Sequence, residues 1–257
     1  MRLNKYLASG TTLSRRAADA AIAAGRVSVD GQNAVQGTEV NEASQVKLDG
    51  KVVTPRPEHT TILLNKPAGY VCSRKGQGSR TIFDLLPPEY QHLQPVGRLD
   101  KDSSGLLLLT DDGDLANQLT HPRYAKTKIY EVTLDKPLQP LHQQMISDMG
   151  VRLEDGVSRF TITKLELRDK SYGIRKKTTP HPGRTSITLH DTALTPYSLP
   201  VTSHLYEVQM TEGRNRQIRR TFAALGYTVT SLHRTHFGPY SLVDLPTSKA
   251  ALASHDA

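Results

Sequence analysis

Tryptophan is absent from the 257-residue sequence, and aromatic residues make up only 5 % of it. Because proteins that stack successive bases need several aromatic rings, this composition argues against a broad single-strand-binding surface. Cysteine occurs once, at Cys72, which excludes an intrachain disulfide and is typical of a cytoplasmic protein. No apolar run approaches the ~18 residues that a membrane-spanning helix needs, and residues 1–5 lead into no secretory signal. We therefore expect no membrane partner.

The sequence carries an excess of positive charge. Lysine and arginine total 33 against 25 aspartates and glutamates, which gives a formal charge of +8 at pH 7. A surplus of this size favours polyanionic partners, because basic side chains attract phosphates and release the counterions bound to them. Charge alone does not separate a nucleic-acid-binding protein from one that is merely basic, so the distinction depends on motifs.

Residues 1–55 are patterned as a small module of their own. Apolar residues recur at helical spacing near the start, and Ser14 is a typical cap for a second helix. The pairs Asp30-Gly31 and Asp49-Gly50 then stand between short alternating strands and predict tight hairpins. The stretch 54–58 contains two prolines, which withhold hydrogen bonds from helix and strand, and it predicts a linker.

Residues 60–245 predict one mixed α+β domain. Short runs of β-branched and apolar residues predict strands, and apolar residues at a 3.6-residue period predict helices. The predicted strands are 61–65, 106–110, 129–134, 161–167 and 205–210, and the predicted helices are 114–120, 139–149 and 216–225. Elements scattered in this way predict a mixed, mainly antiparallel sheet with flanking helices. Residues 170–200, rich in proline, threonine and basic residues, have no clear period and predict a long surface insertion.

The stretch 97–110 reads Gly-Arg-Leu-Asp-Lys-Asp-Ser-Ser-Gly-Leu-Leu-Leu-Leu-Thr and places Asp100 in a polar loop directly before a buried strand. A lone aspartate in a turn is ordinarily a solvated residue. This stretch, however, resembles the Gly-Arg-Leu-Asp signature of the RsuA-type ribosomal pseudouridine synthases, and residues 112–114 and 121–123 fit the same family. The resemblance implies that Asp100 is the catalytic carboxylate.

Two further blocks carry the resemblance. Residues 128–132, Lys-Ile-Tyr-Glu-Val, are similar to the family strand that bears an active-site tyrosine, and this similarity implies that role for Tyr130. Residues 212–220, Glu-Gly-Arg-Asn-Arg-Gln-Ile-Arg-Arg, are similar to the final family motif, in which the arginine after Gln-Ile pairs with the catalytic aspartate. That arginine is Arg219 here. Taken singly, the two blocks would be interpreted as a half-buried strand aromatic and a basic RNA-facing helix.

The first module has a resemblance of its own. The stretches 2–7, 14–16 and 25–31 resemble the alpha-L RNA-binding domain first described in a small-subunit ribosomal protein. Its basic side chains are expected to contact phosphates, which position a protein without reading sequence. Arg98, beside the acid, is expected to fill the space that an extruded base leaves. The expected RNA-binding residues are Arg2, Lys5, Arg15 and Arg16 in the module, and Arg98, Arg214, Arg216, Arg220 and Arg234 in the catalytic domain.

The family chemistry fits these residue types. Pseudouridine formation breaks the nitrogen–carbon glycosidic bond, turns the uracil and rejoins it through carbon 5. Asp100 can add covalently to the sugar or base, or remove a sugar proton to give a glycal, and both routes stay open. Arg219 can hold the carboxylate by paired hydrogen bonds, and Tyr130 can stack on uracil or accept the proton lost from carbon 5. The resemblance implies no cofactor, and it implies ribosomal RNA as the partner of a cytoplasmic monomer.

Other functions are weighed against this one. A non-catalytic, rRNA-binding ribosome assembly factor would have lost the acid, the tyrosine or the arginine, yet all three stand in their motifs. A methyltransferase would need a glycine-rich nucleotide loop, and the sequence has none. His233 and His236 have a spacing seen in metal sites, but no cysteine or carboxylate set completes one, so we expect RNA-facing or surface histidines and no metal. Residues 82–87, Ile-Phe-Asp-Leu-Leu-Pro, look closest to family members that act on large-subunit rRNA, and this resemblance favours that substrate.

Overall fold

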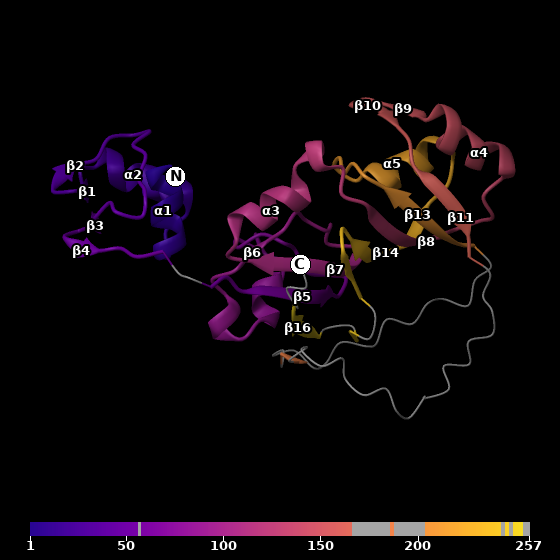
Figure 1. Ribbon diagram of the computed structural model, residues 1–257. Helices are drawn as coiled ribbons and strands as arrows, with labels where there is room; N and C mark the ends of the chain where they lie inside the picture. The colour runs from indigo at the N-terminus through magenta and orange to yellow at the C-terminus, as the bar shows by residue number, and fades with distance from the viewer. Residues whose placement is uncertain (56–57, 166–185, 188–203, 243–244, 247–248, 254–257) are drawn as a thin grey trace. The chain divides into compact units, whose positions relative to one another are not determined.

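The computed structural model describes residues 1–55, 58–165, 186–187, 204–242, 245–246 and 249–253. Contacts along the chain divide it into two compact units, Met1–Thr60 and Thr61–Ala257, which are drawn from indigo to yellow in Figure 1. Each unit has its own buried apolar cluster, so each is described by itself. Among the described residues, no helix combines the length and the apolar character needed to cross a membrane.

The first unit packs two helices with a small antiparallel sheet. Its helices are α1 (Leu3–Gly10) and α2 (Arg15–Ala23), and its strands are β1 (Val27–Val29), β2 (Gln32–Asn33), β3 (Val46–Leu48) and β4 (Lys51–Val52), in the order β2-β1-β3-β4. Ser14 caps α2 by accepting a hydrogen bond from the amide of Ala17. In both Asp-Gly hairpins the aspartate and the glycine have positive φ, as a type I′ turn requires. The predicted helices and hairpins of residues 1–55 are therefore present.

The second unit is built on a ten-stranded sheet that is almost entirely antiparallel among its described strands (Figure 1). The parallel pair is β7 with β14. The order is β11-β13-β8-β14-β7-β5-β16-β12, with β15 beside β14 and β6 beside β7. The strands are β5 (Thr61–Lys66), β6 (Gln94–Pro95), β7 (Ser104–Thr110), β8 (Lys128–Leu134), β11 (Thr161–Lys164), β12 (Ser186–Ile187), β13 (Leu205–Met210), β14 (Val229–Phe237), β15 (Tyr240–Ser241) and β16 (Ala250–Leu252).

The central strands β5 and β7 are buried on both faces. Leu107 and Leu109 belong to one apolar cluster, whereas Leu106 and Leu108 belong to a second cluster on the opposite face. Side chains alternate across a strand, so a continuous apolar run is what a doubly covered strand requires. This double burial fixes the register of β7 and thereby the place where the polar loop before it ends.

Helices and turns complete the second unit. The helices are α3 (Gly113–Thr120), α4 (Pro140–Gln144), which continues as a π-helical turn over Met145–Met149, and α5 (Gln217–Ala224). The hairpin of β9 (Val151–Leu153) and β10 (Gly156–Ser158) packs against α5. Among the described residues, 3₁₀ turns span Ile82–Leu85, Pro88–Tyr90 and Pro122–Tyr124. The mixed, mainly antiparallel fold with flanking helices is confirmed.

Several elements differ from the sequence prediction. Strand β14 was not predicted, because polar residues such as His233 and Arg234 interrupt its apolar pattern although both are buried. The sheet also continues past residue 245, since β16 pairs with β5. The π-helical turn interrupts the single helix predicted over 139–149. The predicted insertion 170–200 lies outside the described residues, except for the two residues of β12.

Candidate active site

A cavity of about 570 Å³ lies in the second unit, and Asp100 is on its wall. Four stretches of the chain line it: the loop before β7, residues 120–130 from the end of α3 into β8, residues 210–218 from the end of β13 into α5, and residues 232–237 of β14. These segments are far apart in sequence but are brought together because β7, β14, β8 and β13 are consecutive neighbours in the sheet. Residues that line the cavity include Arg98, Asp100, Lys128, Tyr130, Arg214, Arg216 and Arg234.

A buried lysine holds the loop that carries Asp100. Lys66, at the end of β5, has no exposed surface, and its Nζ donates to the carbonyls of Pro67, Asp100 and Ser103 at 3.0, 3.1 and 2.7 Å. Burial lowers the pKa of Lys66 to about 8. Lys66 was not among the residues predicted from the sequence, although a lysine that ends an apolar strand directly before a proline is a signal for such a role. Lys66 fixes the backbone on both sides of the loop and so orients Asp100.

Strand β14 approaches the end of this loop closely at Gly105. A Cβ atom there would lie 2.3 Å from the carbonyl oxygen of Arg234, and the φ of Gly105 is +106°. Only glycine permits both the conformation and the contact. One residue earlier, Ser104 Oγ and His233 Nδ1 are hydrogen-bonded at 2.9 Å, and burial lowers the pKa of His233 to about 4. The expectation of a surface or RNA-facing His233 was wrong, because this neutral histidine joins two core strands.

Tyr130, on β8, also lines the cavity. It pairs with Arg234 of β14 and with Val208 of β13, and its side chain is buried. Because directly paired residues of antiparallel strands point to the same face, the side chains of Tyr130 and Arg234 share one face of the sheet. The aromatic ring and the carboxylate of Asp100 thus line the same cavity.

The arginine that reaches Asp100 is Arg216. Its Nη1 lies 3.7 Å from Oδ2 of Asp100, and its two terminal nitrogens donate to both oxygens of Asp102 at 3.1 and 3.2 Å. Arg219 instead lies with Nε 3.4 Å from Asp102 Oδ2 and donates to the carbonyls of Asp102 and Val229. The expected ion pair between Arg219 and Asp100 is therefore not formed, because Arg219 pairs with Asp102 instead.

Asp102 was missed by sequence reasoning, although it stands two residues after the acid. Partial burial opposes its ionisation, but the hydrogen bonds from Arg216 and the charges of Arg219 and Arg216 outweigh it and hold the pKa of Asp102 below its ordinary value. Arg216 itself has a left-handed backbone, with φ of +46° directly before α5. Such a conformation is costly for a residue with a Cβ and is retained where the surroundings enforce it.

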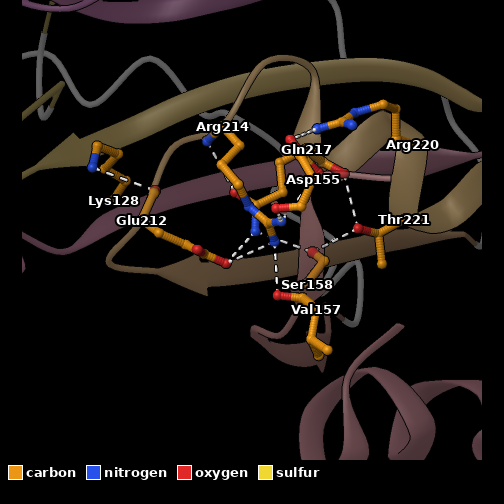
Figure 2. A network of polar contacts seen from close by, with 9 residues as sticks. All are labelled: Lys128, Asp155, Val157, Ser158, Glu212, Arg214, Gln217, Arg220 and Thr221. Atoms are coloured by element: carbon orange, nitrogen blue, oxygen red, sulfur yellow. Dashed lines mark hydrogen bonds and ion pairs between the residues drawn. The ribbon is translucent and has the colours of Figure 1, made fainter. Parts of the chain in front are cut away.

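Two more of the expected RNA-binding arginines, Arg214 and Arg220, also form contacts within the protein (Figure 2). Arg220 donates to Asp155 Oδ2 at 2.7 Å, and Arg214 donates to Asp155 Oδ1 at 3.1 Å and to the carbonyl of Val157 at 2.8 Å. The hydrogen bond from Arg220 is the main cause of a lowered pKa at Asp155. These contacts tie the β9–β10 hairpin to the turn that lines the cavity. Arg214 still reaches the cavity wall, whereas Arg220 does not.

Gln217 fixes the same turn from inside. It is buried, its Nε2 donates to Ser158 Oγ at 3.1 Å and to Glu212, and its Oε1 accepts from the amide of Arg214 at 3.1 Å (Figure 2). Thr221, one turn further along α5, donates to the same Ser158 hydroxyl at 2.7 Å. The Arg214–Arg216 turn is thereby preorganised beside Asp100.

The remaining expected RNA-binding residues differ in exposure. Arg98 is exposed and lines the cavity next to Asp100, whereas Arg234 is only 2 % exposed. In the first unit, Lys5 is half-buried. The other three side chains expected to contact RNA there are exposed, namely Arg2, Arg15 and Arg16. Within the described part of the chain, no three His, Cys, Asp or Glu side chains gather where they could hold a metal ion.

Similarity to known proteins assigns the chain to a family. The model of the RNA pseudouridylate synthase family matches residues 60–224. The chain belongs to this family. Members of it are isomerases, so the chain is an enzyme, and the matched segment contains Asp100, Tyr130 and Arg216.

Relatives from several bacteria match over nearly the whole chain. "Ribosomal large subunit pseudouridine synthase B" of Bacillus subtilis is 35% identical over 97% of this chain and 90% of its own length. An "Uncharacterized RNA pseudouridine synthase" of Aquifex aeolicus is 32% identical over 97% and 88%, respectively. "Dual-specificity RNA pseudouridine synthase RluF" of Salmonella typhi is 33% identical over 95% and 73%. A crystal structure of a pseudouridylate synthase shares the fold, with a TM-score of 0.61, 24% identity, and coverage of 99% of this chain and 96% of that one.

Proposed function

We propose that this pseudouridine synthase isomerises a uridine of ribosomal RNA, and specifically of the large subunit, without a cofactor. The observation that carries the proposal is the carboxylate of Asp100 on the wall of a cavity, with Arg216 3.7 Å away and the buried ring of Tyr130 in the same lining. A cavity of about 570 Å³ is large enough for one extruded nucleotide. The substrate class is supported by the relatives whose names assign them to large-subunit rRNA.

Asp100 is the proposed catalytic carboxylate. Its backbone carbonyl is held by Lys66, and its side chain faces the cationic Arg216, so the carboxylate is kept in a fixed position. In that position it can attack the sugar or base, or remove a sugar proton, and the products of both routes are the same. The role that the sequence analysis gave to Arg219 passes in this proposal to Arg216, while Arg219 holds Asp102.

Tyr130 and Arg98 are proposed to handle the base. The ring of Tyr130 is buried in the cavity lining, where it can stack on an inserted uracil or accept the proton lost from carbon 5. Arg98 is exposed beside the acid, where it can enter the helix space that the extruded nucleotide leaves. Arg214 and Arg220 act in this proposal by holding the cavity-lining turn rather than by contacting phosphates.

The first unit is proposed to be the alpha-L-type RNA-binding domain, covering residues 1–55, and the second the catalytic domain, from residue 60 through β16. Exposed Arg2, Arg15 and Arg16, together with Lys5, would contact phosphates and anchor the enzyme on rRNA. A cytoplasmic monomer acting on rRNA fits the absence of disulfide-forming cysteine pairs.

The proposal is tested by mapping pseudouridines in the rRNA of cells with and without the gene, and by treating unmodified rRNA with the purified protein. We expect one or a few large-subunit uridines to lose the modification without the gene and to gain it in vitro. An assembly factor without catalysis would leave every position unchanged in the purified reaction. Modification confined to small-subunit rRNA would overturn the substrate assignment but not the reaction.

A further inference from the structure

Arg234 is a buried cation whose hydrogen-bonding capacity is only partly used. It lies on β14 between Tyr130 and Gly105, is 2 % exposed and lines the cavity. Its Nε donates to the carbonyl of Leu106 at 2.8 Å, and its guanidinium carbon lies 4.7 Å from the centre of the Phe237 ring. Its Nη2, however, has no hydrogen-bond partner. Buried guanidinium nitrogens normally have hydrogen-bond partners, so one without a partner beside a cavity indicates that a ligand supplies it.

The charge of Arg234 is also uncompensated. Among the described residues, no ion pair joins Arg234 to a carboxylate, whereas two lysines, Lys66 and Lys128, are near enough for the charge of Arg234 to lower their pKa values. Burial and, after it, the charge of Arg234 lower the pKa of Lys128. A buried cation without an anionic partner destabilises the folded chain. Of these cations, Arg234 and Lys128 line the cavity, so a negative charge that compensates Arg234 can be brought by what enters it.

We propose that Arg234 binds the target uracil itself, donating a hydrogen bond to a ring carbonyl oxygen and stabilising the negative charge that the ring acquires during the reaction. The inference rests on the proposed function and assigns Arg234 to the base, in place of the RNA backbone contact expected from the sequence. Burial decides between the two, because an extruded base enters the cavity whereas backbone phosphates stay near exposed side chains such as Arg98.

The charge follows from the bonds that change. When the bond between N1 of uracil and C1′ of the ribose breaks, its electron pair stays on the ring, which becomes an anion delocalised over N1 and the two carbonyl oxygens. Rejoining uses an electron pair of the ring for the new bond from C5 to C1′, after which C5 loses its proton and N1 gains one. Asp100 is the reacting carboxylate, and Arg234 stabilises the anionic ring between cleavage of the bond from N1 and formation of the bond from C5. A preorganised donor aimed at developing negative charge commonly contributes ~10²-fold or more to a rate.

The test uses the full chain on rRNA with the mapped uridine. Arg234→Met should lower the saturating rate by about 100-fold while changing the Kd for rRNA by less than about threefold, with an unchanged salt dependence of binding. Arg234→Lys should recover part of the rate, since it keeps the charge but loses the fork. The matched control is Arg152→Met, which removes an exposed arginine of β9 and should leave rate and affinity unchanged.

Substrate substitution separates a contact with the base from a structural role. RNA carrying 2-thiouridine or 4-thiouridine at the target position replaces one carbonyl oxygen by sulfur, a weaker hydrogen-bond acceptor. One of the two should slow the wild-type enzyme but have much less effect on the Arg234 variants, because the partner is already gone. If Arg234→Met does not fold, the same comparison is made with Arg234→Lys.

Two results would overturn the inference. One is a phosphate pattern, in which Arg234→Met weakens binding and reduces its salt dependence while the saturating rate stays within about threefold of wild type. The other is a result in which each thio substitution slows the wild-type enzyme and the Arg234 variants by the same factor, so that the effects of substrate and protein changes are additive. Failure of the proposed function is distinguishable, because then the wild-type protein itself forms no pseudouridine in rRNA.

Discussion

Arg216 donates to both carboxylate oxygens of Asp102, at 3.1 and 3.2 Å. The same guanidinium faces Asp100 at 3.7 Å, so the residue that touches the proposed catalytic acid is held by a neighbour two positions along the chain. Because Asp102 also lies 3.4 Å from Arg219, one carboxylate orders both arginines. The position of Arg216 beside the acid thus depends on Asp102.

Replacing Asp102 tests this dependence. Asp102→Asn should lower the saturating rate of pseudouridine formation by about tenfold, because a neutral amide holds the two arginines less firmly and roughly 1.4 kcal/mol of positioning is lost. Rates at saturating rRNA measure it. The matched control is Asp49→Asn, which removes the carboxylate of an exposed ion pair with Arg26 and should leave the rate unchanged. Equal rates for wild type and Asp102→Asn would show that Arg216 needs no such support.

The contact at Gly105 makes a stability prediction. Gly105→Ala should lower the free energy of unfolding by about 3 kcal/mol or more, because the new Cβ would both strain a φ of +106° and meet the backbone of Arg234. Gly226→Ala is the control for strain alone, since its φ is +80° but nothing lies within 4 Å, and it should cost about 1–2 kcal/mol. Denaturant unfolding of both variants measures the difference, and equal losses would contradict the close approach of β14 to β7.

His233 predicts a dependence of stability on pH. Its pKa is about 4 in the folded chain and near 6.5 when unfolded, so the unfolded state binds the extra proton between these values. The stability that neutral His233 contributes is therefore fully present above pH 6.5 and is lost as the pH falls towards 4, by ~3 kcal/mol in all. His233→Asn should remove this part of the pH dependence, as measured by urea unfolding at pH 4.5 and 7. If wild type and His233→Asn differ in free energy of unfolding by the same amount at both pH values, His233 titrates normally.

The first unit is expected to contribute to the affinity of the protein for rRNA. A protein lacking residues 1–55 should bind rRNA more weakly and with a smaller salt dependence, because phosphate contacts are lost. Its second unit keeps a complete apolar core and should still fold. Filter binding at several salt concentrations measures both quantities. Unchanged affinity and salt dependence would exclude the first unit as an RNA anchor.

Much of the fold could be predicted because local signals were strong. The four leucines of β7 and the Asp-Gly hairpins predicted their elements, since burial on both faces and positive φ leave few alternatives. Strand β14 could not be predicted in the same way. Its buried His233 and Arg234 are hydrogen-bonded to Ser104 and to the carbonyl of Leu106, which are more than 100 positions away, and such partners cannot be seen in the periodicity of the sequence.

The residues of the candidate site, too, could be predicted only in part. Asp100 and Tyr130 could be named from motifs, and both line one cavity. Lys66 and Asp102 could not, because their roles lie in contacts with backbone carbonyls and with two arginines that only the folded chain brings near. The motif also led to the wrong arginine as the contact of Asp100, because Arg216 lies directly before α5 with a left-handed backbone whereas Arg219 lies inside the helix, and this difference in backbone sets where each side chain points.

The most direct test is to measure pseudouridine formation in large-subunit rRNA by the Asp100→Asn protein at saturating RNA. The amide keeps the shape of the carboxylate and its place opposite Arg216, but it is neither a nucleophile nor a base. We expect no product above a trace, with the affinity for rRNA within about twofold of wild type because the phosphate contacts are untouched. Sustained turnover by Asp100→Asn would contradict the assignment of Asp100 as the catalytic carboxylate.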